Sequence, residues 1–410
     1  MPNCLDFHPG TYQAPSPNMI TALQVVLLFL MAASVVFYSW CAICTSRFRT
    51  DSQKDICTSG QPVSVLIPVC GVDEFALDNW VSFCQQDYEH YEVLFGVMNP
   101  EDEAVPILKE LVARFPDRAK LILCLEARGV NHQVSNLMHL IEAARHEVVI
   151  LTDSDMRVTP DYLRTVKAPL ADPSIGLVTC GYVGHNPKFL GAALASLGRC
   201  VDFIPSVLVA RSLDGELRFA LGATLATRKS VLDKFGGLQK VVNRIGSDYH
   251  IGKLTQAAGY RIVLSDYILE TDGGRETVSQ VFRREWRWAR AIRFNRGSQY
   301  YGLGLSYGTV YCIPLLLLSD FANWAIIVCL ATLSARVIQA LVAIYRLDCP
   351  NLLRWIWALP IRDFMSFTVW VAGTFGQRIY WRGRWLQIEA GGILAKVEPE
   401  ESPYPSASVQ

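Results

Sequence analysis

The chain has few charged residues and carries no net charge. Only 19% of its 410 residues are charged, and 38 Lys and Arg balance 38 Asp and Glu. Without an excess of positive charge, there is no electrostatic reason to expect a nucleic-acid partner. The hydrophobic share of 51% is too high for an ordinary soluble protein, yet the charges are too many for a chain wholly inside a membrane. The composition therefore indicates a soluble domain joined to membrane segments.

The sequence also lacks internal repeats and a cysteine framework. Its 12 cysteines are scattered, and several, such as Cys312 and Cys329, stand inside apolar runs. This distribution predicts buried thiols in a reducing compartment and not a set of disulfides. Cys41 and Cys44 have C-x-x-C spacing, but they end an apolar stretch without metal-type neighbours, which argues against a zinc or redox site.

A stretch almost free of charge follows the first residues of the chain. Residues 19–44 are long enough to cross a bilayer, which takes roughly 20 apolar residues. No small-residue cleavage site follows, and Arg47 and Arg49 come next. Basic residues after an apolar segment favour an uncleaved anchor whose downstream side faces the cytoplasm. We interpret residues 1–18 as a tail and 45–60 as a linker.

A second apolar region covers residues 300–375. It contains three candidate transmembrane or re-entrant helices, Tyr307–Leu318, Phe321–Tyr345 and Leu352–Phe375. Arg336 and the pair Arg362-Asp363 are costly in lipid, so they either face a bundle interior or mark helix ends at the interface. Residues 376–410 are basic and aromatic before a polar tail, which is typical of a cytoplasmic juxtamembrane segment. We therefore predict a multi-pass membrane protein.

Between the two apolar regions, residues 61–297 have the composition of a globular domain. Strand-like runs alternate with helix-like stretches such as Glu103–Phe115 and Gln133–Ala144. The strand-like runs are Val63–Pro68, Glu92–Val97, Leu121–Leu125 and Val148–Thr152. This alternation predicts an α/β domain with a Rossmann-like, mostly parallel sheet.

Two carboxylates follow the last of these strands, in Asp153-Ser154-Asp155. Ligands of open α/β sheets bind at the carboxyl ends of the strands. Carboxylate oxygens so arranged suit Mg²⁺ or Mn²⁺, and such an ion can bridge the two phosphates of a nucleotide. A solvated strand end is the alternative, and this motif alone does not decide between the two.

Two further motifs follow in order along the chain. They are Gly246-Ser247-Asp248-Tyr249 and Arg284-Glu285-Trp286-Arg287-Trp288, which fits [Q/R]-x-x-R-W just before a membrane region. Together with the opening strand Val63–Val69 and the paired aspartates, they resemble lipid-directed glycosyltransferases related to family 2, and most closely the ceramide glucosyltransferase family, family 21. The resemblance covers about Gln61 to Gly392. The stretch Phe203–Ala210 is most similar to a bacterial branch that adds N-acetylglucosamine to bacteriohopanetetrol.

The resemblance implies a GT-A domain that moves one hexose, glucose or N-acetylglucosamine, from a UDP-sugar to the hydroxyl of a membrane lipid with inversion. It implies that Asp248 is the general base, that Arg287 pairs with the diphosphate, and that Trp288 offers a flat face to the sugar or lipid head. Asp155 would hold Mg²⁺ or Mn²⁺, with Asp153 near the metal or the ribose, and Arg284 would join the donor site. The bacterial branch further implies an inner-membrane protein whose catalytic domain is cytoplasmic.

Two positions depart from the family pattern. Asn99 stands where the family has an Asp that contacts the nucleoside, and Gln133 stands where it has a Lys. Both amides can still hydrogen-bond a nucleotide, but losing a charged hydrogen bond costs about 1.5–3 kcal/mol. We therefore expect donor affinity or identity to differ, and we hypothesise that Asn99 and Gln133 are a coupled pair tuned to one donor.

Two other functions remain open at the level of the sequence. A processive polysaccharide synthase of family 2 would share the motifs, although few membrane helices are available to form a channel. A lipid- or partner-binding pseudo-transferase would explain Asn99 and Gln133, although the intact Asp155, Asp248 and Arg287 argue against it. Ceramide-type, hopanoid-type and diacylglycerol acceptors are all compatible with the motifs.

Overall fold

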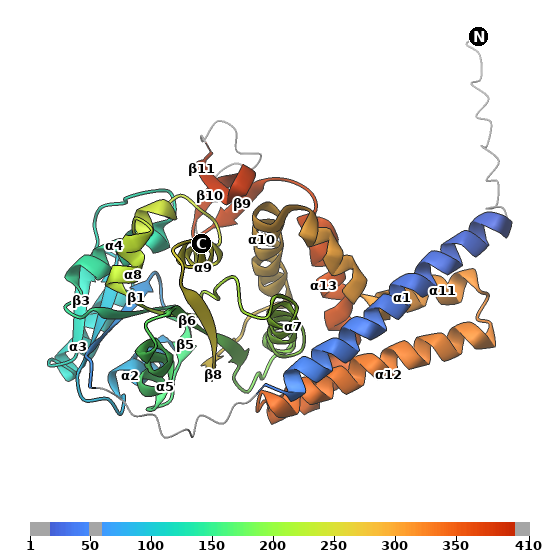
Figure 1. Cartoon of the computed structure of the whole chain (residues 1–410), viewed down its shortest axis with the longest axis horizontal. Coiled ribbons are helices and arrows are strands. Elements are labelled where there is room, and N and C mark those ends of the chain that lie inside the picture. The colour runs from blue at the N-terminus through green and yellow to red at the C-terminus, as the bar shows by residue number, and fades with distance from the viewer. Residues whose placement is uncertain (1–16, 49–59, 398–410) are drawn as a thin grey trace, which may run out of the picture.

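The structure, a computed structural model, describes residues 17–48 and 60–397. The predicted polar tail at the C-terminus, most of the N-terminal tail and most of the linker lie outside these residues. An α/β domain forms one part, and a helical arm projects from it (Figure 1). Two long apolar helices that are far apart in the sequence dominate the arm.

An eight-stranded sheet forms the centre of the α/β domain, with strand order β3-β2-β1-β4-β7-β6-β8-β5. The strands are β1 (Val63–Val69), β2 (Tyr91–Val97), β3 (Ala119–Leu123), β4 (Val148–Thr152), β5 (Met156–Arg157), β6 (Ile175–Gly184), β7 (Thr224–Arg228) and β8 (Arg261–Thr271). The first four are parallel, as predicted, and β6 is parallel to β8. Strand β7 runs antiparallel to both β4 and β6, and β5 is antiparallel to β8, so the whole sheet is mixed.

Helices cover both faces of this sheet, which is why its strands are apolar on both sides. Alternate residues of β1 enter different cores: Val65 packs with α2 (Ala76–Cys84), α3 (Ala104–Arg114) and α5 (Tyr162–Lys167), whereas Leu66 packs with α4 (His132–Ala143). Two short helices complete the domain, α8 (Lys229–Lys234) and α9 (Ser247–Ala257). The α/β class predicted from the sequence is confirmed.

A buried carboxylate ties the first strands together. Glu92 of β2 has a fully buried side chain that accepts hydrogen bonds from Ser64 Oγ (2.9 Å) and from the backbone N (2.8 Å) and Nε (2.9 Å) of Arg145. Burial works to raise the pKa of Glu92, but these hydrogen bonds outweigh it and hold the pKa below its usual value.

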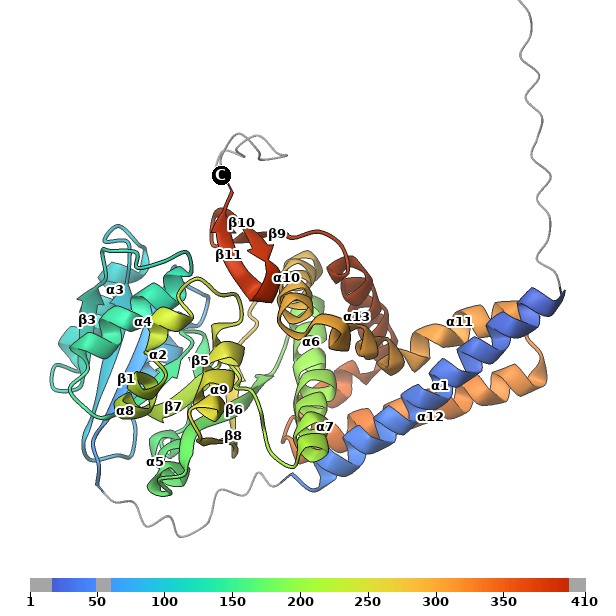
Figure 2. The ribbon, with the colours of Figure 1, turned by 45° about the horizontal axis from the view of Figure 1, so that its top comes forward.

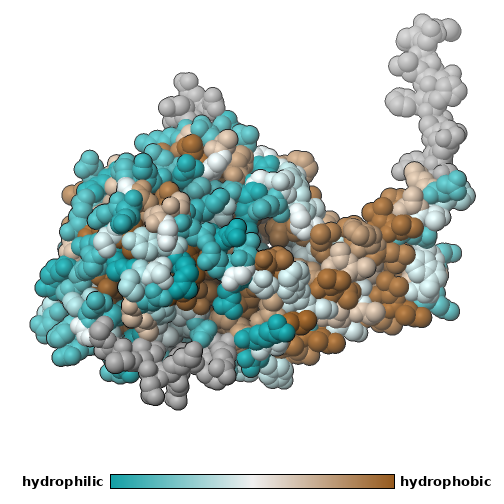
Figure 3. All heavy atoms as spheres, in the orientation of Figure 1, coloured by the Kyte–Doolittle hydropathy of each residue, from teal (hydrophilic) through white to brown (hydrophobic). Residues whose placement is uncertain are grey.

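The helical arm consists of α1 (Pro17–Ser46), α11 (Gly308–Leu318) and α12 (Asn323–Arg346). Helices α1 and α12, with 30 and 24 residues, are long and apolar enough to cross a membrane. Large apolar side chains cover their outer surfaces, for example Phe29 and Ile327, and the arm is the most hydrophobic part of the view in Figure 3. The predicted N-terminal anchor and one of the three predicted C-terminal helices, α12, are therefore candidate spans, whereas α11 could span only together with the segment before it, from which it is bent by 58°.

A third helical segment is equally apolar but lies inside the protein. It comprises α6 (Leu190–Leu197), the π-helical turn Gly198–Phe203 and α7 (Ile204–Asp214), and most of its residues are buried. Figures 1 and 2 show it between the sheet and the arm. A helix that is hydrophobic all round must be covered on every side, and here the sheet and the neighbouring helices cover it.

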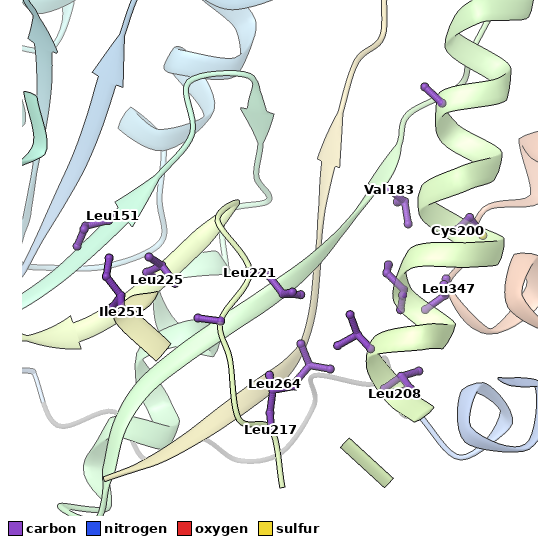
Figure 4. Packing of buried hydrophobic residues seen from close by; sticks show 14 of the residues in the cluster. Leu151, Val183, Cys200, Leu208, Leu217, Leu221, Leu225, Ile251, Leu264 and Leu347 are labelled. Atoms are coloured by element: carbon purple, nitrogen blue, oxygen red, sulfur yellow. The ribbon is translucent and has the colours of Figure 1, made fainter. Parts of the chain in front are cut away.

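One continuous hydrophobic core joins the domain to the arm. Figure 4 shows Leu151 and Leu225 from β4 and β7, Cys200 and Leu208 from the buried helical segment, and Leu347 from the end of α12. Because such cores are densely packed, the arm and the sheet are held in a fixed relation.

The C-terminal part returns to the α/β domain. Helix α10 (Val278–Arg296) carries the Arg284–Trp288 motif and packs against α13 (Leu359–Gly373), which has only 15 residues. Between these helices lie the 3₁₀ segments Gly297–Ser306 and Pro350–Ala358. The final described residues form a small antiparallel sheet, which the sequence had not suggested, of β9 (Arg378–Trp381), β10 (Arg384–Glu389) and β11 (Ile393–Lys396).

Five charged side chains form a buried ion cluster where the arm meets the domain. Arg336 of α12 pairs with Asp363 of α13 and with Asp202 of the π-turn, each at 2.6 Å. Arg362 pairs with Asp202 at 3.2 Å and with both carboxylate oxygens of Glu285 on α10, at 2.7 and 2.8 Å. The costly residues of the apolar region therefore face the protein interior, where they neutralise one another.

Candidate donor site

The paired aspartates lie where β4 ends, in the turn that leads to β5. The indole Nε1 of Trp80 donates to the carbonyl oxygen of Ser154 at 3.2 Å and fixes this turn. The amide Nε2 of Gln133, in the first turn of α4, donates to Asp153 Oδ1 at 2.7 Å. Asn131 caps that helix by accepting from the amide of Val134, which sets the position of Gln133.

Electrostatic coupling shows that three of the predicted carboxylates lie close together. The pKa of Asp153 is raised to about 8, first by burial and then by the neighbouring charges of Asp155 and Asp248, while Gln133 and Arg382 oppose the change. Like charges that raise one another's pKa are stabilised by a bound cation.

Asp155 lies on the side of the site that faces the buried helical segment. Burial raises its pKa, Arg199 and Arg284 act to lower it, and Asp73 acts to raise it. Within residues 17–48 and 60–397, no three His, Cys, Asp or Glu side chains are already arranged as a metal cage. The donor set of two or three carboxylates nevertheless fits a hard divalent ion that takes its remaining ligands from phosphate and water.

Asp248 enters the site from the first turn of α9. Gly246, with φ of +65°, begins the turn before this helix, and a Cβ at Gly222 would lie 3.2 Å from Asp248 Oδ2. Burial raises the pKa of Asp248, opposed by backbone N–H groups of Tyr249, Asp248 and Gly222. A carboxylate with a raised pKa is a better proton acceptor than an ordinary surface aspartate.

Helix α10 carries the Arg284–Trp288 motif, which places Arg287 at the donor site and Glu285 in the ion cluster. It starts with a capping box between Thr277 and Gln280. Burial, aided by the charges of Arg284 and Arg382, lowers the pKa of Arg287 to about 10, so the guanidinium is still charged at neutral pH. This guanidinium lies 5.2 Å from the ring centre of Trp381. Electrostatic contact with Asp153 places Arg287 beside the aspartates.

The other motif residues have partners within the protein. Arg284 pairs with Glu276, and its guanidinium lies 5.3 Å from the ring centre of Trp288. Glu285 points the opposite way, into the ion cluster. Trp286 packs under Arg290 at 4.0 Å. One helix therefore connects the donor site with the base of the arm.

Asn99 follows β2 but stands apart from the aspartates. It is exposed, and its Oδ1 accepts from the amide of Glu101 at 3.1 Å, which closes a local turn. Gln133 bonds to Asp153 instead, so the two departures from the family pattern have different partners in this structure. Their coupling remains a prediction.

The structure adds three residues that reasoning from the sequence did not assign to the site. Arg382, in the turn between β9 and β10, donates to the carbonyl oxygen of Cys70 at 2.9 Å and acts on the pKa of Asp153. Arg199 and Tyr182 approach Asp155 from the buried helical segment and from β6. The one sign of Arg382 in the sequence is its place in the basic, aromatic segment 376–410, and only the fold brings these distant residues together.

Comparison with known proteins gives consistent matches. The sequence profile described as "Glycosyl transferase family 21" matches residues 26–394. Ceramide glucosyltransferase 1 of Caenorhabditis elegans is 26% identical over 277 residues, 65% of this chain and 56% of that protein. Ceramide glucosyltransferase 3 of the same organism is 24% identical over 298 residues, 69% of this chain and 62% of that protein. The match therefore spans less than two thirds of either relative.

Among solved structures, mannosyltransferase PcManGT from Pyrobaculum calidifontis, in complex with GDP-Man and Mn²⁺, aligns with a TM-score of 0.49 and 19% identity. The alignment covers 86% of this chain and 99% of that one. TarS 1–349 of S. aureus aligns with a TM-score of 0.39 and 11% identity, over 82% and 98% of the two chains.

Proposed function

The chain belongs to glycosyltransferase family 21, and from that premise we propose that it transfers one hexose from a UDP-sugar to the hydroxyl of a membrane lipid. The proposal depends on one observation: Asp153, Asp155, Asp248 and Arg287 lie together at one end of the sheet. Arg287 lies on α10, and Glu285 of the same helix joins the ion cluster at the base of the apolar arm. A lipid lying along the arm can present its head group without leaving the bilayer.

Each side chain has a role in this reaction. The hydroxyl oxygen of the acceptor attacks the anomeric carbon, Asp248 takes the hydroxyl proton, and the bond from that carbon to the diphosphate breaks, leaving its electron pair on the phosphate oxygen. Arg287 binds the diphosphate through paired N–H groups. Since one base acts and no enzyme nucleophile is required, the configuration at the anomeric carbon inverts.

A divalent ion fits the same arrangement. Asp155 and Asp153 would hold Mg²⁺ or Mn²⁺, which would supply positive charge to the leaving diphosphate. Gln133 keeps Asp153 oriented at 2.7 Å without adding a charge, in contrast to the lysine of the family pattern. We therefore propose that donor binding here depends more on the metal and the arginines than on that position.

The substrates proposed are glucose or N-acetylglucosamine as the donor sugar and a ceramide-type or hopanoid lipid, such as bacteriohopanetetrol, as acceptor. The apolar surfaces of α1 and α12 support a membrane protein, for which we propose the bacterial inner membrane with the α/β domain on the cytoplasmic side. Arg47, directly after α1, is consistent with that orientation.

Expression in a host that lacks glycolipids, followed by mass spectrometry of its lipids, tests the proposal. A new hexosyl or N-acetylhexosaminyl lipid is expected, and the Asp248→Asn variant should lose it while still binding UDP. The matched control is Asp172→Asn, an exposed aspartate that precedes β6 at the opposite end of the sheet, and it should retain the product. A polymer formed from UDP-sugar without lipid, or no transfer with either metal, would refute a single-sugar lipid transferase.

A further inference from the structure

A buried arginine in the π-helical turn lacks the partners that such a group needs. Arg199 is 7% exposed, and its Nε and Nη1 have no hydrogen-bond partner. It forms no ion pair with any carboxylate in the described ranges. An unpaired buried charge costs several kcal/mol, so a protein that retains one usually supplies it with an opposite charge. Arg199 acts to lower the pKa of the nearby Asp155, but no ion pair or hydrogen bond joins these two side chains, and its Nε and Nη1 stay without a partner.

The surroundings of Arg199 show where an anion would enter. Its guanidinium lies 5.2 Å from the ring centre of Tyr182, and Phe203 packs edge-on against the same ring at 5.9 Å. Tyr182 interacts electrostatically with Asp155 and Arg284 as well as with Arg199. The guanidinium of Arg199 therefore faces the Asp155 side of the donor site.

A second guanidinium has spare donors at the same place. Arg284 uses Nη1 for Glu276, but its Nε and Nη2 are buried without a partner. Both arginines act on Asp155. Two buried guanidiniums with unused N–H groups beside a candidate metal ligand match the oxygens of a phosphate, which accepts several charged hydrogen bonds at once.

The π-turn explains how Arg199 is presented. Its neighbour Gly198 packs directly against the guanidinium of Arg362, so that a side chain at position 198 would clash with it. Asp202 of the same turn joins the ion cluster. The π-turn thus contributes Asp202 to the ion cluster and Arg199 to the donor site. Such π-helical turns occur frequently at functional sites.

We propose that Arg199, together with Arg284 and Tyr182, forms the subsite for the distal phosphate of a nucleoside diphosphate donor, an inference that rests on the proposed function. The nucleoside is expected near the end of β2, on the other half of the sheet, whereas the π-turn that carries Arg199 contacts β6. Arg199 therefore binds the phosphate that is bonded to the sugar. This phosphate keeps the electron pair when the bond to the sugar breaks.

The experiment compares UDP and UMP binding, with Mn²⁺, to the full chain in detergent. Arg199→Gln should weaken UDP binding by roughly tenfold or more, because charged hydrogen bonds are lost, while UMP affinity stays within about twofold. Arg199→Lys should keep part of the UDP affinity, since it keeps the charge. Equal UDP affinity in wild type and Arg199→Gln would overturn the subsite.

Thermal unfolding without ligand separates this role from a structural one. Removing a buried guanidinium whose Nε and Nη1 have no hydrogen-bond partner should raise the melting temperature of Arg199→Gln and reduce the added stabilisation by UDP. The control, Arg228→Gln, removes a guanidinium that donates to the carbonyl oxygens of Leu170, Pro173 and Ile175, and it should lower the melting temperature without changing UDP affinity. A lower melting temperature for Arg199→Gln would overturn the proposal.

The two hypotheses fail differently in these measurements. If the wild-type chain does not bind UDP, the proposed function falls and the subsite falls with it. If wild type binds UDP and Arg199→Gln binds it equally well, only the subsite is wrong.

Discussion

Replacing Arg362 with methionine should destabilise the protein strongly. This side chain is 7% exposed and donates to Glu285 at 2.7 and 2.8 Å and to Asp202 at 3.2 Å. Methionine fills similar space but leaves Glu285, itself 9% exposed, as a buried charge without its partner. Breaking a buried pair in this way typically costs about 3–5 kcal/mol. We expect Arg362→Met to lower the free energy of unfolding by that amount.

The matched control is Arg164→Met, which removes a surface ion pair. Arg164 pairs with Asp87 at 2.5 Å, but the two side chains are 40% and 74% exposed. Exposed pairs of this kind contribute about 0–1 kcal/mol. Urea unfolding of the full chain in detergent micelles, followed by tryptophan fluorescence, measures both variants on one scale. A loss for Arg362→Met no larger than that for Arg164→Met would refute the reasoning.

A double variant tests the cause of the effect. Glu285→Gln removes the charge that Arg362→Met strands, so the double change should be less destabilising than the sum of the single ones, by about 1–3 kcal/mol. The pair also sets the position of α10, which carries Arg284 and Arg287. Turnover should therefore fall in Arg362→Met even below the urea concentrations at which it unfolds, whereas Arg164→Met should keep wild-type turnover.

Three further outcomes are expected. Because the pKa of Glu92 is held below its usual value, its ionised form stabilises the fold above the unfolded pKa, and this stability is lost as the pH falls through the folded pKa; Glu92→Gln should cost about 1.5–3 kcal/mol at neutral pH in urea unfolding, and its difference from wild type should shrink in acid. Donor titrations of Asn99→Asp, Gln133→Lys and the double variant should show non-additive effects, and strict additivity would contradict their coupling. Asp155→Asn should abolish the effect of Mn²⁺ on UDP affinity, measured by titration with and without the ion, and an unchanged metal effect would remove Asp155 from the metal site.

The regular half of the fold could be predicted because its signals are local. Strand β4 has the predicted bounds, and β1 and β2 differ from their predicted ranges by one residue at an end. The apolar runs and the alternation with helices follow from burial on both faces of a parallel sheet. The mixed second half was less accessible, since β7 pairs with β4 across a long excursion of the chain.

Other features could not be predicted because they depend on distant contacts. The buried helical segment at 190–214 has the composition of a membrane span, and only its neighbours in space show that it is a core helix. Strands β9 to β11 were read as a basic, aromatic segment, because their cross-strand partners are not visible in a linear pattern. Arg199 had no motif of its own, and its importance comes from the absence of a partner in the folded protein.

The ion cluster also couples folding of the α/β domain to membrane insertion of α12. Arg336 stands near the middle of α12, where a lone arginine in lipid costs about 2.5–3.5 kcal/mol at insertion. Arg336 has two carboxylate partners, Asp202 and Asp363. Asp363 is synthesised after Arg336, so only Asp202 is already part of the chain when α12 has been made. Asp202 is in place only after the helix that carries it has packed on the sheet. Insertion of α12 therefore costs less once the α/β domain has folded, because the packed π-turn then presents Asp202 to Arg336.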